Sequence, residues 1–230
     1  MSKLPPIRVT FFGDSICVGQ GVSIYQGWVT RIAKDLDDYG TEIGRGILVT
    51  NASFNGRTTR QALEDMPYSV QSHGVDICLV QFGLNDCNHW LTDKGLPRVS
   101  RGAFSENLRE IVSRAIHFGA FRIMLNTNHP TDLDREVMPG AVITYEASNR
   151  NYNEAIRALA PELDPRVRLQ DIEDCFRRRI AAGTPIETLL LPDGLHLSEQ
   201  GHRLYFDLVR PAIRAAVCEF AEHQRENAAR

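Results

Sequence analysis

The sequence lacks the features that define several large classes of protein. Its 230 residues contain five cysteines, which are scattered and include no C-x-x-C pair. We therefore expect free thiols in a reducing compartment rather than a disulfide framework. No stretch is apolar and long enough to cross a membrane, and the residues before Gly13 do not form a signal peptide. These absences predict a cytoplasmic protein that does not insert into membranes.

Motifs for charged partners and for cofactors are also missing. The net charge of -3 gives no electrostatic reason to expect binding to nucleic acid or to an anionic membrane. Gly19-Gln20-Gly21 lacks the third glycine of a dinucleotide-binding fingerprint, and neither G-x-x-x-x-G-K nor H-E-x-x-H occurs. We expect no cofactor and no metal. Oligomeric state stays open, because no heptad pattern or exposed apolar stripe stands out.

The sequence does contain a regular alternation of predicted strands and helices. Apolar runs of strand length occur at residues 7–12, 47–51, 76–82, 121–126 and 167–171. Helical spacing predicts helices at residues 28–36, 58–67, 104–118, 142–159, 175–181 and 198–223, followed by a frayed polar tail. This alternation predicts one α/β domain over residues 1–230, with its core at about 7–222, in three layers around a mostly parallel sheet.

Four of the five predicted strands end in hydroxyl, amide or imidazole side chains. The first strand continues into Gly13-Asp14-Ser15, and the third continues into Gly83-Leu84-Asn85-Asp86. The carboxyl ends of parallel strands share one edge of the sheet, where open α/β folds bind ligands. Two long irregular segments, residues 87–100 and 127–140, follow the third and fourth strands and are expected to border a site.

A histidine with a nearby carboxylate occurs late in the chain. Asp193 precedes His196 by three residues in a turn that contains glycine, so the carboxylate can lie close to the imidazole. A carboxylate on one ring nitrogen fixes the tautomer and leaves the other nitrogen free as a general base. Ser15, at the end of a strand, is a suitable nucleophile for that base.

Acyl transfer also needs hydrogen-bond donors for the oxyanion that develops on the substrate carbonyl. The turn at Ser15 exposes its backbone N–H. Gly56 lies in a polar loop before a helix, and its lack of a side chain lets its N–H approach a substrate. The side-chain amide of Asn85 follows the third strand and is the third candidate donor.

Four sequence blocks occur along the chain in the following order: Gly13-Asp14-Ser15-Ile16, Gly56, Gly83-Leu84-Asn85-Asp86 and Asp193-Gly194-Leu195-His196. Together and in this order, they resemble the GDSL, or SGNH, hydrolase superfamily. The resemblance extends from about residue 7 to about residue 210, and it implies a flavodoxin-like fold with a five-stranded parallel sheet of order 2-1-3-4-5. It also implies that Ser15 is the nucleophile, that His196 is the base with Asp193 as its partner, and that Ser15, Gly56 and Asn85 form the oxyanion hole. An α/β-hydrolase elbow is excluded, since it would need G-x-S-x-G around the nucleophile.

Several neighbouring residues have candidate roles beside these blocks. Asp14, His129 and Trp90 are candidates for lining the substrate site, although Asp14, like Asp86, is expected mainly to hold its turn. His129 could equally order its own loop. We expect His202 to be structural, and we expect solvated positions for four arginines, which are Arg57, Arg60, Arg98 and Arg101.

The expected reaction is hydrolysis of a small-molecule carboxylic ester through an acyl-enzyme on Ser15. No strongly apolar lid segment is present, which favours a short acyl group, such as an O-acetyl ester on a carbohydrate, over a long-chain lipid. An acyltransferase, a thioesterase or a lysophospholipase could use the same residues. A metal-dependent phosphoesterase built on Asp14, His129, Asp193 and His196 is a further alternative.

Overall fold

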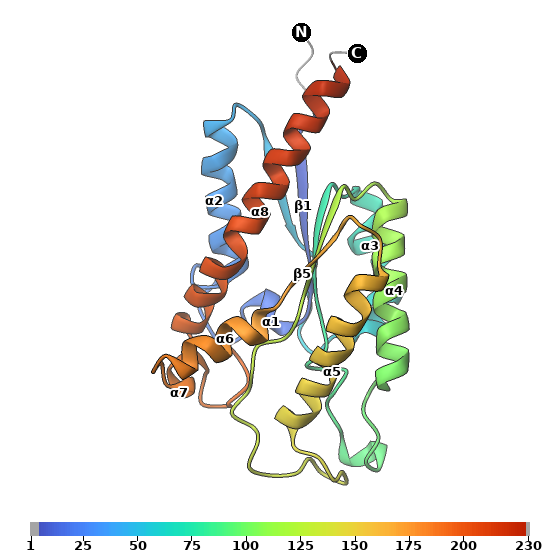
Figure 1. Cartoon of the computed structure of the whole chain (residues 1–230), viewed down its shortest axis with the longest axis vertical. Helices are drawn as coiled ribbons and strands as arrows, with labels where there is room; N and C mark the ends of the chain where they lie inside the picture. Colours follow the sequence, from blue (N-terminus) through green and yellow to red (C-terminus); the bar gives the residue numbers. More distant parts are fainter. Residues whose placement is uncertain (1–4, 229–230) are drawn as a thin grey trace.

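The centre of the molecule is a parallel sheet with helices on both faces (Figure 1). The structure, a computed structural model, describes residues 5–228. The strands are β1 (Ile7–Gly13), β2 (Ile47–Asn51), β3 (Ile77–Gln81), β4 (Arg122–Asn126) and β5 (Val167–Gln170). All neighbouring pairs are parallel, and their order across the sheet is β2-β1-β3-β4-β5. The predicted fold class and strand order are therefore confirmed.

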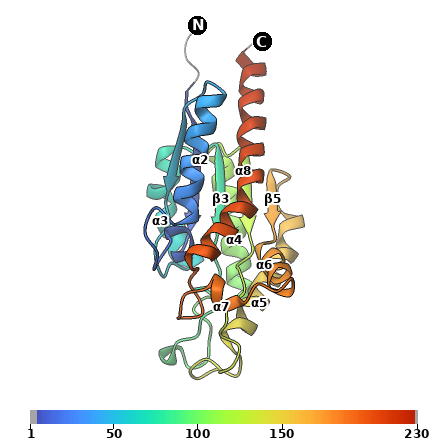
Figure 2. The same cartoon turned by 90° about the vertical axis from the view of Figure 1, so that its left-hand side faces the viewer.

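The helices divide between the two faces of the sheet (Figures 1 and 2). One face is covered by α2 (Trp28–Glu42), α6 (Ile172–Ala181) and α8 (Glu199–Ala228), with the short helices α1 (Ser15–Val18) and α7 (Ile186–Leu189) beside them. The other face is covered by α3 (Thr59–Ser69), α4 (Arg101–His117) and α5 (Tyr145–Leu159). This arrangement encloses the central strands, which explains why β3 is apolar from Ile77 to Val80 and is buried at every residue.

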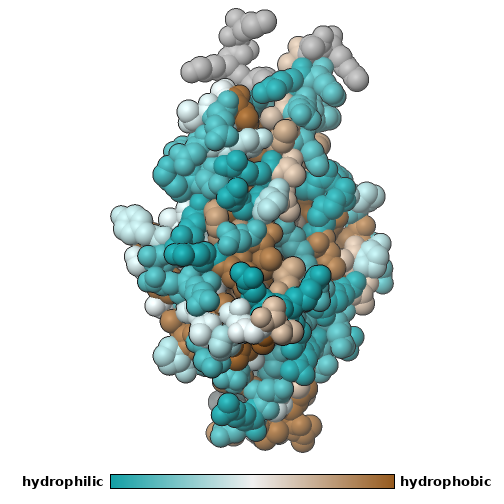
Figure 3. Space-filling model, turned by 60° about the vertical axis from the view of Figure 1, so that its left-hand side comes forward, coloured by the Kyte–Doolittle hydropathy of each residue, from teal (hydrophilic) through white to brown (hydrophobic). Residues whose placement is uncertain are grey.

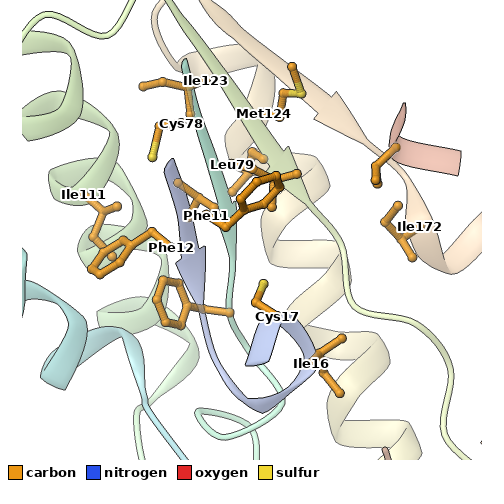
Figure 4. Close-up of a cluster of buried hydrophobic side chains, with 14 of the residues drawn as sticks. Phe11, Phe12, Ile16, Cys17, Cys78, Leu79, Ile111, Ile123, Met124 and Ile172 are labelled. Atoms are coloured by element: carbon orange, nitrogen blue, oxygen red, sulfur yellow. The ribbon is translucent and has the colours of Figure 1, made fainter. Parts of the chain in front are cut away.

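The hydrophobic core follows from the alternation of side chains along the strands. Phe11, Leu79 and Met124 occupy one row of paired residues and point to the face that α2 and α8 cover. Phe12 points the other way, to the side on which Ile111 of α4 lies (Figure 4). Each of these five side chains is at most 1% exposed, so β1 is anchored in the core on both faces.

Trp28 connects α1 to this core. Its indole Nε1 donates a hydrogen bond of 2.9 Å to the carbonyl oxygen of Ile16. Its ring stacks on Tyr205 of α8 at 4.5 Å and meets the edge of Phe11 at 5.3 Å. Because Ile16 directly follows Ser15, this packing fixes the turn that carries the predicted nucleophile.

Several helix boundaries differ from the predicted ones because of capping groups. Thr144 caps α5 by accepting from the N–H of Ala147, so the helix begins at residue 145 rather than 142. Asp171 caps α6 in the same way, so α6 begins at residue 172 rather than 175. The short helix α7 lies between the helices predicted at residues 175–181 and 198–223, where the sequence predicted no helix.

The prediction of a frayed tail after residue 223 is wrong for most of that segment. Helix α8 continues to Ala228, and residues 229–230 lie outside the described part of the chain. Its later turns are held because Phe220 packs against Phe121 and because Gln224 accepts a hydrogen bond from Arg45. Within residues 5–228, no helix is both long enough and apolar enough to span a membrane.

The segments after β3 and β4 pack against each other at the lower end of the molecule in Figure 1. Gly95 and Gly140 are in close contact, and both have positive φ angles, so neither could carry a side chain without strain. Hydrophobic side chains gather at this end of the surface (Figure 3). The exposed apolar side chains of the two segments include Leu91, Leu96, Val137 and Val142.

Candidate active site

Ser15 lies at the junction of β1 and α1. Asp14 is the N-cap of α1, and its Oδ1 accepts a hydrogen bond of 3.0 Å from the N–H of Ile16. As the first residue of the helix, Ser15 has a backbone N–H without an intrahelical partner. Its side chain lies at the surface of a small cavity, and the residue is 7% exposed. The strand end therefore presents both a hydroxyl and an unused N–H to this cavity.

The segment 190–198 is folded into a tight turn that carries Asp193 and His196. Leu190 pairs with Leu197, and the N–H of Leu191 donates to the carbonyl of His196 at 2.7 Å. One carboxylate oxygen of Asp193 accepts from the N–H groups of Leu195 and His196, both at 2.9 Å. This local hydrogen bonding fixes the carboxylate beside the imidazole.

Ser15, His196 and Asp193 form a continuous chain of hydrogen bonds. The Nδ1 atom of His196 lies 2.6 Å from Oδ2 of Asp193, and Nε2 lies 3.0 Å from Oγ of Ser15. Burial alone would raise the pKa of Asp193, but hydrogen bonds from His196 and the nearby N–H groups outweigh it and hold the pKa below the ordinary value. An ionised carboxylate keeps the ring proton on Nδ1, which leaves Nε2 free to accept the serine proton.

The three predicted oxyanion donors border the same cavity. It has a volume of about 200 Å³ and is lined by Ser15, Gln20, Gly56, Leu84, Asn85, Tyr145, Leu195 and His196. In the described part of the chain, the N–H groups of Ser15 and Gly56 donate to no protein acceptor. Gly56 has φ +74°, a conformation that disfavours any side chain. The three candidate donors therefore border one cavity, and two of them are backbone N–H groups without a protein acceptor.

The three predicted substrate-lining residues do not line this cavity. Asp14 and His129 are both fully buried and are not among the residues that line it. The Nε2 atom of His129 lies 2.8 Å from the carbonyl oxygen of Leu195, so His129 holds the turn that carries His196. Trp90 is about half exposed and lies outside the set of lining residues.

Two arginines that were predicted to be solvated hold the loop of Gly56 instead. Arg57 is 3% exposed, donates to the carbonyl of Ala52 at 2.7 Å and stacks on Phe54 at 4.3 Å. Arg98 donates to the carbonyl of Gly56 at 3.1 Å, and its guanidinium stacks on Trp90 at 4.2 Å. Trp90 is therefore connected to the rim of the cavity through Arg98.

Sequence reasoning missed four residues of the cavity wall, which are Gln20, Leu84, Tyr145 and Leu195. Leu84 and Leu195 are neighbours of motif residues, and this adjacency could have identified them. Tyr145 carries no such signal, since α5 brings it from a distant part of the sequence. Its hydroxyl donates to the carbonyl of Leu84, beside Asn85.

The expected structural roles of Asp86 and His202 agree with the contacts. Asp86 accepts hydrogen bonds from the N–H and hydroxyl of Thr59, at the start of α3. The Nδ1 atom of His202 lies 3.3 Å from the backbone nitrogen of Trp28. Within residues 5–228, no three or more His, Cys, Asp or Glu side chains are arranged to hold a metal ion, so the four residues weighed for a phosphoesterase do not form a ligand set.

Comparison with known proteins identifies the family. The sequence profile of the GDSL-like lipase/acylhydrolase family matches residues 11–204. The chain belongs to this family, and the resemblance inferred from the four sequence blocks is confirmed.

The sequence identity between this chain and individual relatives is low. The chain is 27% identical over 123 residues to an arylesterase of Vibrio mimicus, a match that covers 54% of this chain and 56% of the relative. It is 28% identical over 118 residues to esterase TesA of Pseudomonas aeruginosa, with 51% and 53% covered. These matches span about half the length of each curated relative. Among solved structures, Axe2, an acetylxylan esterase from Geobacillus stearothermophilus, has a TM-score of 0.70 at 20% identity, covering 89% of this chain and 93% of that one, and shares the fold.

The buried position of His129 predicts a specific pH dependence of stability. Burial lowers the pKa of His129 to about 4, from an ordinary value of 6.5. Between these values the unfolded chain binds a proton that the folded chain does not, so the contribution of neutral His129 to stability is lost as the pH falls. The His129→Gln variant keeps an N–H donor for the carbonyl oxygen of Leu195. Because it has no imidazole to protonate, this loss of stability at low pH should be absent.

Urea unfolding of both proteins between pH 4 and pH 7 measures this effect. The free energy of unfolding of the wild type, relative to that of His129→Gln, should decrease as the pH falls from 6.5 to 4. A difference that stays constant across this range would show that His129 does not remain neutral in the folded protein.

Proposed function

We propose that this protein hydrolyses carboxylic esters, with Ser15 as the nucleophile, His196 as the general base and Asp193 as the partner of His196. The observation that carries the proposal is the hydrogen-bonded chain from Asp193 through His196 to Ser15, at 2.6 Å and 3.0 Å, beside two uncommitted backbone N–H groups. Membership of the GDSL-like lipase/acylhydrolase family supports it.

In the proposed reaction, Oγ of Ser15 attacks the ester carbonyl while Nε2 of His196 takes the hydroxyl proton. The ionised carboxylate of Asp193 stabilises the imidazolium that forms. The carbonyl oxygen gains negative charge and is stabilised by the N–H groups of Ser15 and Gly56 and by the amide of Asn85. His196 then protonates the leaving alcohol, and water, activated by the same base, releases the acyl group from Ser15.

The size of the cavity supports a short acyl group. A volume of about 200 Å³ also has to hold the reacting carbonyl, and its apolar wall comes from Leu84, Tyr145 and Leu195. This wall suits a few methyl or methylene groups rather than a long chain. The named activities of relatives and structural neighbours, arylesterase and acetylxylan esterase, also concern esters. We therefore infer that the substrate is a small ester with a short acyl group, such as an O-acetyl ester on a carbohydrate.

Removing the nucleophile gives the first test. Ser15→Ala should lower kcat for p-nitrophenyl acetate by a factor of about 10⁴ to 10⁶, to the level of residual binding effects, because no acyl-enzyme can form. His196→Ala should fall as far, since the two residues act as a unit, and Asp193→Ala should fall less. Purified variants and wild type are compared by release of p-nitrophenol.

Circular dichroism and urea unfolding of the same preparations control for misfolding. A correctly folded Ser15→Ala variant that retained the wild-type rate would contradict the proposed mechanism.

Acyl-chain length gives the second test. Across p-nitrophenyl acetate, butyrate and octanoate, which share one leaving group, kcat/KM should be highest for acetate and at least about tenfold lower for octanoate, because extra methylenes do not fit. Leu84→Ala enlarges the cavity at its apolar wall and should shift the ratio of butyrate to acetate hydrolysis towards butyrate.

Leu91→Ala, at an exposed position in segment 87–100, is the matched control and should leave this ratio unchanged. The ratio is measured on each preparation, so it does not depend on how much of the protein is active. Equal or rising kcat/KM from acetate to octanoate in the wild type would overturn the assignment of a short acyl group.

A further inference from the structure

Asp14 has a buried carboxylate that the proposed reaction leaves unexplained. The residue is 0% exposed, and within residues 5–228 it has no ion-pair partner, although burying an unpaired carboxylate is costly. Its Oδ1 caps α1 through the N–H of Ile16. Capping needs only one acceptor oxygen, which serine, threonine or asparagine would also supply. The second oxygen therefore calls for a separate explanation.

The second oxygen, Oδ2, is held within a row of buried polar side chains along the edge of the sheet. Gln81, at the end of β3, lies with its Nε2 at 3.4 Å from Oδ2 and at 3.0 Å from Oδ1 of Asn128. The side-chain amide oxygen of Gln81, Oε1, accepts from the thiol of Cys17 at 3.3 Å. These contacts place the amide nitrogen of Gln81 beside two acceptor oxygens, those of Asp14 and Asn128. With Gln81 donating to it, Oδ2 of Asp14 is an acceptor that can also receive an N–H of Asn85.

Asn85 is the remaining group beside Oδ2. Its Nδ2 lies 3.5 Å from Oδ2 of Asp14, a long contact of the kind that tightens when a transition state is bound. An amide nitrogen carries two hydrogens, so one can face Asp14 while the other faces the cavity that Asn85 lines. If the amide were flipped, its oxygen would face both the carboxylate and the developing oxyanion. A carboxylate at position 14 disfavours that orientation.

We propose that Asp14 is a positioning residue that holds the side-chain amide of Asn85 with its N–H directed at the substrate oxygen. This inference rests on the proposed function, in which Asn85 is an oxyanion donor. Asp14 does not touch the substrate. It acts through Asn85, and its cap to Ile16 also keeps the adjacent Ser15 N–H in place.

The two roles of Asp14 can be separated by substitution. Asp14→Ser keeps an oxygen that can cap α1, but its side chain is too short to reach Asn85. Asp14→Asn is nearly isosteric and can also cap the helix, but its amide can donate to the Asn85 oxygen and so favours the flipped orientation. Asn85→Ala removes the donor itself. Burial raises the pKa of Asp14 to about 7, so the kinetics are measured at pH 8.5, where its carboxyl is ionised.

A double-mutant cycle on hydrolysis of p-nitrophenyl acetate tests the proposal. Asn85→Ala should lower kcat by about 10²-fold to 10³-fold, the typical effect of losing one oxyanion donor. In the wild-type background, Asp14→Ser and Asp14→Asn should each lower kcat by about tenfold or more with little change in KM. In the Asn85→Ala background, each should lower kcat by less than about twofold, because the group they act through is gone.

The outcomes separate this inference from the proposed function. If Asn85→Ala slows the reaction but the Asp14 variants cost the same factor in both backgrounds, Asp14 does not act through Asn85 and the inference is wrong, while the proposed function stands. If Asn85→Ala leaves kcat unchanged, both the inference and the proposed oxyanion hole are wrong. Urea unfolding shows whether each variant is folded. If Asp14→Ser destabilises the turn, the double-mutant cycle of Asp14→Asn with Asn85→Ala still tests the inference.

Discussion

The hydrogen bond between Ser15 and His196 is the contact on which the candidate site depends. It joins residues that are 181 positions apart, so its length of 3.0 Å requires both ends to be fixed independently. Ser15 is fixed by β1, by the Asp14 cap and by Trp28 beneath α1. His196 is fixed by the turn around Asp193 and by the contact of His129 with Leu195. Each support is buried or local in sequence, which keeps the geometry rigid.

The edge of the sheet combines this geometry with a costly set of buried polar groups. Asp14, Gln81 and Asn128 are at most 1% exposed, although polar side chains are stable inside a protein only when they are hydrogen-bonded. Most polar side-chain atoms at this edge have hydrogen-bond partners. In the described part of the chain, Nδ2 of Asn128 and Nδ1 of the neighbouring His129 have none. A protein selected for stability alone would place apolar residues here. Polar groups at this edge are consistent with orienting the donors of a catalytic site.

Much of this arrangement could be predicted from sequence, for identifiable reasons. Continuous apolar runs predict the strands, since a strand buried on both faces needs them, and β3 shows this at residues 77–80. Ser15, Gly56, Asn85 and His196 were placed by short motifs whose order is typical of the family, and the structure brings them to one cavity.

The remainder depends on contacts between distant segments, which single-sequence patterns do not encode. Arginine is a residue type usually found at the surface, yet Arg57 is 3% exposed, with its guanidinium over the ring of Phe54 and paired with Asp65. His129 was as compatible with a substrate contact as with a structural one, and only its bond to Leu195 distinguishes them. Tyr145 reaches the cavity because α5 packs beside the end of β3, a fact of tertiary structure.

The central claim is that Ser15 attacks a carbonyl and carries the acyl group. The most direct measurement is mass spectrometry of the protein after reaction with a short-chain alkyl phosphonate ester, which forms a stable adduct on an activated serine and mimics the tetrahedral intermediate. The account predicts a single adduct on the peptide that contains Ser15, together with loss of all esterase activity. An adduct on another residue with equal loss of activity, or full labelling without loss of activity, would contradict it.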